Sequence, residues 1–436
     1  MLAPLLLIIK LIFGGLLGAG IGLFMAKSLR ITLGAVFISY WLIFVWDDNG
    51  PLVTLGTDIT FYEVLGGLAL LALIVRIKLL GKKVRRNKTL SIILFFLVAG
   101  ELVTIFTSVF KFGLSTLSIY KPAITYVILL LLFYSFDVSR KDFIAAFKWL
   151  AFYSAITILL VPIRIFGILE MPIAVRDAGS WEGYRYIINY QSLYLVFFVL
   201  AFLIIAINRK KDLGIFSTAL FALTVPVVVL IPQRMVWILF ALSIFYLVMV
   251  YRARISPKIF AGAGIAAGIL LILIQLPQLE DFLFVTKASL FNPFELFFES
   301  NAGYRFFDNI VMTQQVISQG KTLTGLGIQA AIGREVLGHY MEYPVHNYIV
   351  YKFVQGGLSL AVPHLLLMLY LVFKLRRFSD PRFPDFYVQI LWLSVSCMFL
   401  FSLTTFGGPH MVIPLGLALS LLSTKLPVRA DVDVRP

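Results

Sequence analysis

Three basic side chains stand at places in this apolar chain where they could do chemistry. Arg234 begins an apolar run after a short Pro-Gln turn, Arg305 begins a segment whose apolar residues have helical spacing, and His346 with Asn347 begins a later apolar run. A guanidinium presents a planar fork of donors that suits phosphate oxygens. An imidazole takes up a proton near neutral pH. The residue types therefore predict an anion clamp and a general base.

Each of these residues also has an ordinary structural interpretation. At a membrane boundary, Arg234 is explained equally well as a side chain that snorkels to the interface. For Arg305 the spacing alone favours a salt bridge to Asp308, and a lone histidine at a membrane edge is usually structural. Ionisable groups at membrane depth are nevertheless functional candidates by default. Because Lys352 and Gln355 continue a polar stripe along the run that follows the histidine, we expect the stripe to be functional.

Glu101 and His364 are two further ionisable groups inside long apolar runs. Glu101 is either a proton-relay carboxylate or, in the interpretation we favour, the satisfied partner of a nearby Ser or Thr. His410 follows the turn "FGGP" and is a second candidate for the site. His346, His364 and His410 are scattered, with no cysteine among them and no HExxH spacing, so they do not indicate a metal site.

The elements that position these residues are expected to be transmembrane helices. The chain has 436 residues, of which 60% are hydrophobic and 14% charged, and its mean hydropathy is +0.95. Runs long enough to cross a hydrocarbon core recur along it, which predicts an all-α polytopic membrane protein with about 12 or 13 spans. The first run, with Lys10 and a glycine-rich stretch, is alternatively a re-entrant or surface-lying segment. The runs are 5–26, 31–46, 60–80, 90–110, 121–136, 143–163, 187–207, 213–231, 235–251, 258–276, 345–373, 386–403 and 409–423.

The basic residues predict the orientation of these spans. Most of the 37 Lys and Arg fall in one alternating set of connections, including "RIKLLGKKVRRNK" and the C-terminal tail. The positive-inside rule places that set, and the C-terminus, in the cytoplasm. The net charge of +15 is then a topology signal that matches anionic membrane lipids, and no nucleic-acid partner is expected. We expect no cleavable signal peptide and, with a single cysteine, no disulfide.

One long connection, 277–344, separates two groups of spans on the side opposite the cytoplasm. The expected organisation is a transmembrane bundle in 1–276, a periplasmic loop with interfacial helices in 277–344, and the C-terminal spans with a cytoplasmic tail in 345–436. The apolar spacing after Arg305 predicts a helix in this loop, ended by the tight turn "GLG" at 325–327.

Three stretches together resemble the signature of the bacterial O-antigen ligase/polymerase family. They are "IPQRMVWILFALSIF" (231–245), "YRFFDNIVMTQQVISQGKTLTGLGIQ" (304–329) and "HNYIVYKFVQGGLSL" (346–360). The resemblance covers about 225–375, and the N-terminal half matches only as a run of spans. Gln233 stands where the family often has Ser or Thr, and "QGG" stands where it often has Glu, which weakens any subfamily assignment. The implied fold is a GT-C-like bundle in the bacterial inner membrane.

The resemblance implies transfer of a glycan from an undecaprenyl-pyrophosphate carrier to an acceptor hydroxyl at the periplasmic face, without a cofactor. Under this hypothesis Arg234 and Arg305 clamp the pyrophosphate and His346 activates the acceptor hydroxyl, in an inverting reaction that needs no metal. Further residues are expected to bind the donor or acceptor. They are Asn347, Arg164, Arg176, Arg185, Tyr304, Lys352 and His410.

The acceptor is either a second carrier-linked repeat, as for a polymerase, or the lipid A core, as for a ligase. The loop 277–344 carries seven acidic and four basic residues, which does not favour a phosphate-dense acceptor. We therefore favour a polymerase of O-antigen or a related polysaccharide, and a partner that sets chain length stays an open expectation. A transporter or flippase for lipid-linked sugars is the alternative of another class, although no paired halves are evident.

Overall fold

The structure is a computed structural model and is almost entirely helical. It describes residues 2–46, 53–54, 58–81, 87–165, 189–209, 215–230, 234–251, 264, 265, 268, 301–328, 334–336, 339–341, 347–376, 386–403 and 411–423. Two small antiparallel ribbons interrupt the helices. They pair β1 (Val53–Thr54) with β2 (Asp58–Ile59) and β3 (Arg334–Val336) with β4 (His339–Met341).

The helices follow the predicted apolar runs. In chain order they are α1 (Leu2–Lys27), α2 (Leu29–Trp46), α3 (Phe61–Ile74) with the π-helical turn η1 (Val75–Leu79), α4 (Lys88–Phe112), α5 (Thr116–Tyr134), α6 (Arg140–Ile165), α7 (Asn189–Arg209), α8 (Ile215–Leu230), α9 (Arg234–Tyr251), α13 (Asn301–Ser318), α14 (Tyr348–Arg376), α15 (Phe386–Ser402) and α16 (Val412–Ser423). Every predicted run except 258–276 coincides with a helix, and that run lies almost wholly outside the described residues. In hydrocarbon a helix satisfies its backbone polar groups internally, which is why long apolar runs become helices.

Three of these helices are long and apolar enough to cross a membrane. They are α4, α14 and the Arg140–Leu159 part of α6, and shorter apolar helices accompany them. Large apolar side chains cover the outward face of α4, where Phe95, Phe106 and Phe110 are 68%, 60% and 87% exposed. A face of this kind is unfavourable in water and suits lipid. The expectation of an all-α membrane protein is therefore confirmed at this level.

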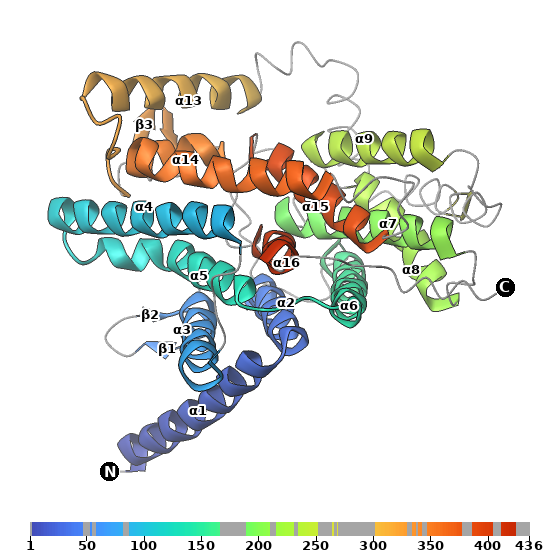
Figure 1. The fold of residues 1–436 in the computed structure, drawn as a ribbon, viewed down its shortest axis with the longest axis horizontal. Helices are drawn as coiled ribbons and strands as arrows, with labels where there is room; N and C mark the ends of the chain where they lie inside the picture. The colour runs from blue at the N-terminus through green and yellow to red at the C-terminus, as the bar shows by residue number, and fades with distance from the viewer. Residues whose placement is uncertain are drawn as a thin grey trace.

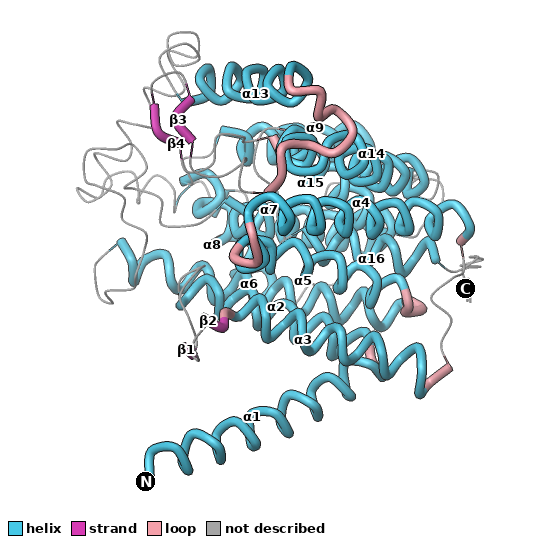
Figure 2. Tube along the Cα trace, turned by 90° about the vertical axis from the view of Figure 1, so that its left-hand side faces the viewer, coloured by secondary structure: helices cyan, strands magenta, loops and turns pink. Residues whose placement is uncertain are grey.

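The helices pack in a layered bundle. Along one side, α13, α14, α4, α5, α3 and α1 contact one another in that order, and α15, α7 and α6 lie beside them (Figure 1). Figure 2 shows the first part of α1 extending away from the other helices. Because α1 packs mainly on α2 and α3, it lies at the margin of the bundle.

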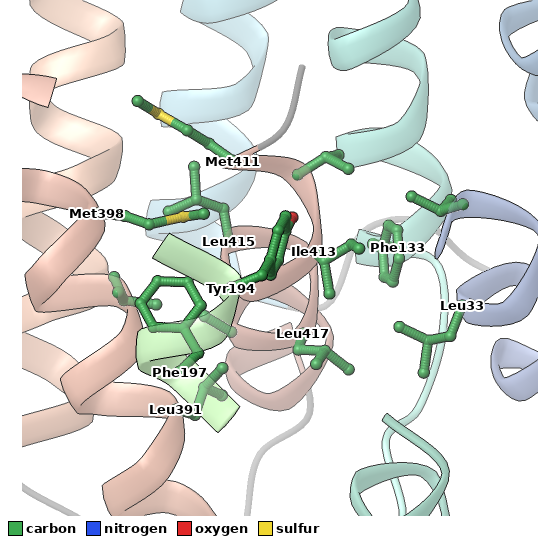
Figure 3. Packing of buried hydrophobic residues seen from close by; sticks show 14 of the residues in the cluster. Leu33, Phe133, Tyr194, Phe197, Leu391, Met398, Met411, Ile413, Leu415 and Leu417 are labelled. Carbon is green, nitrogen blue, oxygen red and sulfur yellow. The ribbon is translucent and has the colours of Figure 1, made fainter. Parts of the chain in front are cut away.

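The main apolar core surrounds α16, all of whose residues 412–423 are buried. Side chains from α2, α5, α7 and α15 meet there, as Figure 3 shows for Leu33, Phe133, Tyr194 and Leu391 around Ile413. The C-terminal span is thus an interior element of the bundle.

The helix predicted in the long loop is α13. It begins at Asn301, four residues before Arg305, and it ends at Ser318 and not at the turn 325–327. Gly320, with φ of 66°, ends it, because the amide of Lys321 then reaches back to the carbonyl of Val316 at 3.0 Å. The prediction of a helix is confirmed, and the predicted position of its end is wrong by about two turns.

Candidate functional site

The candidate site is built around a break in α14, which the sequence led us to expect as one continuous span. Gly357 has φ of 64° and ψ of −156°, outside the helical region. The hydroxyl of Tyr348 nevertheless lies 3.2 Å from Nδ1 of His364, sixteen residues later. In an unbroken helix these positions would be about 24 Å apart. We therefore describe α14 as a short segment (348–356) that folds back on a long segment (358–376).

The loop 319–328, which follows α13, closes this break. A broken helix leaves carbonyls at the end of one segment and amides at the start of the next without helical partners, and inside a membrane such groups must be bonded within the protein. The loop supplies both kinds of partner. The bonds are Leu326 N to Val354 O (2.7 Å), Gly327 N to Gln355 O (3.1 Å), Leu358 N to Thr322 O (2.8 Å) and Ser359 N to Leu323 O (3.2 Å).

Small residues on one face of α4 let the loop and the break approach closely. Gly100, Thr104 and Ser108 recur every four residues, so they lie along one stripe of the helix. A Cβ on Gly100 would come within 2.3 Å of the carbonyl oxygen of Ser359, and Ser108 Oγ accepts a bond from the amide of Ile328 at 3.0 Å. Small residues in such a stripe allow close helix contacts in membranes.

A buried charge cluster lies beside the break. Oε1 of Glu101 accepts bonds from Lys352 Nζ and from His364 Nε2, each at 3.0 Å, and Oε2 accepts from the hydroxyl of Tyr120. Glu101, Lys352 and His364 are only 5%, 3% and 1% exposed. Glu101 is thus satisfied, as we favoured from the sequence, but its partners are these three side chains and not a Ser or Thr.

Aromatic rings complete the surroundings of this cluster. The Lys352 ammonium lies 5.4 Å from the ring centre of Tyr120 and 5.8 Å from that of Tyr348, and the ring of Tyr126 stacks on His364 at 6.1 Å. Because a carboxylate only accepts, Nε2 of His364 must carry the proton shared with Glu101. In a neutral imidazole Nδ1 is then the acceptor for the Tyr348 hydroxyl.

Asn347, predicted to bind substrate, caps the short segment of α14. Its Oδ1 accepts from the amides of Ile349 (2.9 Å) and Val350 (3.1 Å), and its Nδ2 donates to the carbonyl of Leu403 (2.7 Å). An asparagine commonly caps a helix in this way. Both acceptor positions of Oδ1 are used, and one Nδ2 proton is left for a further acceptor. Lys352, also predicted to bind substrate, instead has its ammonium in the buried cluster.

The helix that carries Tyr304 and Arg305 packs directly on the short segment of α14. Met312 and Val316 of α13 form a small core with Tyr351 and Val354 of α14 and with Leu326 of the closing loop. Tyr304 and Arg305 belong to the first turns of α13, and their side chains lie outside the described residues. The second and third motifs are therefore joined through this apolar cluster and through the backbone hydrogen bonds of the closing loop.

Arg234 begins α9, which runs antiparallel to α15. Three side-chain contacts fix the register: Tyr251 with Gln389, Tyr246 with Trp392, and Ser243 with Cys397. Continuing this register brings the start of α9 to about one helical turn beyond Ser402, the end of α15. Asn347 is tied to the neighbouring Leu403, so the starts of α9 and α14 lie at the same end of the bundle. We call this end, where α15 also finishes, the motif end.

The remaining predicted site residues carry no structural description. His346, Arg176, Arg185 and His410 lie outside the described residues, and so does the side chain of Arg164, whose backbone is in the last turn of α6. The sequence reasoning missed the roles of Tyr120 and Tyr348. The signal that was present is that Glu101, Lys352 and His364 are ionisable groups inside apolar runs, and such groups tend to pair.

No protein-family model, curated protein or solved structure matches the chain. What the protein does is therefore inferred from its motifs and from the geometry of the motif end.

Proposed function

We propose that the protein is a membrane glycosyltransferase that moves an undecaprenyl-pyrophosphate-linked glycan onto an acceptor hydroxyl. The observation that supports this most is the meeting of three motif-bearing elements at one end of the bundle. The start of α9 lies near the end of α15, Asn347 joins α14 to α15, and α13 packs on α14. Residues that are far apart in the sequence thus belong to neighbouring elements, as one site requires.

The chemistry needs a base and an anion clamp. As the acceptor oxygen attacks the anomeric carbon, its proton passes to His346 and the bond from that carbon to the phosphate oxygen breaks. The leaving undecaprenyl pyrophosphate gains negative charge, which Arg234 and Arg305 stabilise because guanidinium groups bond phosphate oxygens in pairs. Attack opposite the leaving group inverts the anomeric centre, and the arginines supply positive charge that a metal provides elsewhere.

An apolar cavity in the bundle matches the chemistry of the carrier's lipid chain, although it is smaller than the whole chain. Side chains of α6, α7, α15 and α16 line it, and Figure 3 shows Tyr194, Phe197, Leu391 and Ile413 among them. A polyisoprenoid is wholly hydrocarbon, so an aromatic and aliphatic lining favours its burial.

A polymerase is the form of this activity that we favour, with the motif end at the periplasmic face of a bacterial inner membrane. The acidic excess of the loop 277–344 would repel a phosphate-rich lipid A core more than a sugar repeat. The ligase remains the alternative acceptor choice. In a reconstituted assay a polymerase makes a ladder of repeats on the carrier, whereas a ligase makes a product only when lipid A core is added.

The broken helix favours one candidate of another class. Helices interrupted at membrane depth, beside buried ionisable groups, also occur in transporters, and α14 with Glu101 and Lys352 has both features. Purified protein in proteoliposomes, given the lipid-linked donor and an acceptor, separates the two. Product with a new glycosidic bond supports the enzyme, and movement of the donor across the bilayer without a new bond supports a transporter.

Variants test the residue roles. We expect His346→Ala, Arg234→Ala and Arg305→Ala each to lower transfer at least a hundredfold, because each loses a proton acceptor or a phosphate contact. His339→Ala, in the same loop but outside the signature, is the histidine control, and Arg140→Ala, in a predicted cytoplasmic connection, is the arginine control. Full transfer by any properly inserted signature variant removes that residue from the scheme.

A further inference from the structure

The proposed chemistry gives no role to the buried cluster of Glu101, Lys352 and His364. Its members come from α4 and from both segments of the broken α14, and Tyr120 adds α5 through its bond to Glu101. Burying two opposite charges costs solvation that their attraction often fails to repay, and an apolar set of similar volume often packs as well or better. Stability alone is therefore a poor reason for this cluster.

The short segment of α14 is fixed at the break, so its other end, at Tyr348, must be restrained separately. The closing loop bonds to residues 354–359 and so fixes the apex of the break. Tyr348 lies nine residues from Gly357, or about 13 Å along a helix. A tilt of about 10° at the apex would therefore move the far end by about 2 Å, and displacements of about 1 Å from a productive geometry already slow catalysis greatly.

Besides the bond of Asn347 to Leu403 and the packing of α13, the cluster supplies directed contacts that resist this tilt. Lys352 and Tyr348 are on the short segment, and His364 is on the long one. The ammonium of Lys352 and the imidazole of His364 share Oε1 of Glu101, while Tyr348 and His364 are joined directly at 3.2 Å. The angle between the two segments is thus set by side chains whose common partner, Glu101, is on α4. Apolar contacts would allow sliding that these directed bonds do not allow.

We infer that Glu101, Lys352 and His364 are positioning residues, which hold the short segment of α14 and the Asn347 that caps it in the geometry needed for glycan transfer. That these residues support glycan transfer rests on the proposed function. That they hold the short segment in place rests on the structure alone. None of the three touches substrate in this scheme.

The test uses full-length protein in nanodiscs and the double variant Glu101→Gln/Lys352→Met. Removing both charges together avoids leaving one of them buried without a partner, so this variant is the one expected to fold. The matched control is Glu63→Gln/Lys121→Met. It removes an ion pair of the same residue types, 2.6 Å long, that joins α3 to α5 and has side chains 28% and 21% exposed.

Three quantities are measured on each protein: the rate of amide hydrogen exchange in the peptide 347–356, and kcat and KM for the lipid-linked donor. We expect the double variant to exchange at least tenfold faster in that peptide and to lose at least tenfold in kcat, with KM within about twofold of wild type. The control should change none of the three. His364→Gln, which keeps a neutral hydrogen-bonding side chain, should retain more kcat than His364→Leu.

Exchange at the wild-type rate in the double variant overturns the inference, and so does wild-type kcat despite faster exchange. If the wild-type protein transfers no glycan, the proposed function fails, and the exchange result still decides whether the cluster holds the segment.

Discussion

Nδ2 of Asn347 donates a hydrogen bond to the carbonyl oxygen of Leu403 at 2.7 Å and so ties the start of α14 to the end of α15. The same side chain caps the short segment through Oδ1. A residue expected from the sequence to bind a hydroxyl is thus part of the frame of the motif end. The bond also links the C-terminal motif to the helix against which α9 packs.

The two bonding roles of Asn347 can be separated by substitution. Asn347→Ala removes both, and we expect it to lower the free energy of unfolding by about 1 kcal/mol, the usual cost of a lost cap. Asn347→Asp keeps the acceptor for the two amides but places a carboxylate beside the carbonyl of Leu403. We expect apparent Tm to fall less for Asp than for Ala, and glycan transfer to fall in both. Equal Tm for both variants and the wild type would show that the side chain does not cap α14.

The backbone at Gly357 sets the break, and a side chain there should be poorly tolerated. An added Cβ would lie 2.4 to 2.6 Å from backbone atoms of Thr322 and Leu323, besides straining the positive φ. Gly320 also has positive φ, at 66°, but nothing lies within 4 Å of its Cβ position. We expect Gly320→Ala to cost about 1 kcal/mol of stability and Gly357→Ala several-fold more, measured as apparent Tm in nanodiscs. Similar losses in the two variants would mean that the closing loop is not packed against the break.

Most helices of this fold could be predicted from the sequence because their signal is local. A run of about twenty apolar residues has no other way to satisfy its backbone in lipid, and the predicted runs coincide with α2 through α9 and α14 through α16. The break in α14 was missed because apolar residues continue through it. The Gly356-Gly357 pair was the available sign, yet glycines are frequent in transmembrane helices and do not by themselves predict a break.

The sequence predicted which residue types belong to the candidate site, but it did not predict which of those side chains contact one another. Lys352 was recognised as an unusual cation at membrane depth, but its partner Glu101 is 251 residues away, and no local spacing connects them. Asn347 was recognised as part of the site, but capping by an asparagine depends on where the helix begins, which becomes evident only in the structure. The pairing of α9 with α15 is nonlocal in the same way.

The buried pair of Lys352 and Glu101 should respond to single substitutions much more strongly than an exposed pair. Lys352→Met leaves the carboxylate of Glu101 buried with one charge partner removed, which typically costs about 3–5 kcal/mol. Lys121→Met opens the partly exposed pair with Glu63, for which about 0–1 kcal/mol is usual. We expect the apparent Tm of Lys352→Met to be clearly the lower of the two. If they are equal, the Glu101 carboxylate is reached by water or is not charged in the folded protein.

Gln355 is a test of whether the whole polar stripe is functional. The residue is 1% exposed, and its Oε1 has no hydrogen-bond partner among the described residues. A buried acceptor without a partner costs about 1–3 kcal/mol, so Gln355→Met, of similar volume, should leave apparent Tm unchanged or raise it. We expect transfer activity to be retained, because Gln355 has no place in the scheme. Loss of transfer at unchanged Tm would instead assign Gln355 to the site.

The position of Arg234 along the bundle axis depends on the register between α9 and α15. An engineered disulfide can measure that register. Ser243 Oγ lies 3.3 Å from Sγ of Cys397, the single cysteine of the chain, so a sulfur at position 243 is close to bonding distance after a small rotation. We expect Ser243→Cys to form a disulfide with Cys397 on mild oxidation. To detect it, a protease site is inserted in the segment 252–300 and the chain is cleaved there. The two fragments then stay joined until a reductant is added. Leu247→Cys, one helical turn away, and Ser243→Cys/Cys397→Ala should not cross-link.

If cross-linking is as good from 247 as from 243, the register is shifted by a turn and Arg234 begins α9 about 6 Å from the level inferred here. Arg234 and the Asn347 cap would then be at different depths, which would contradict the proposed scheme.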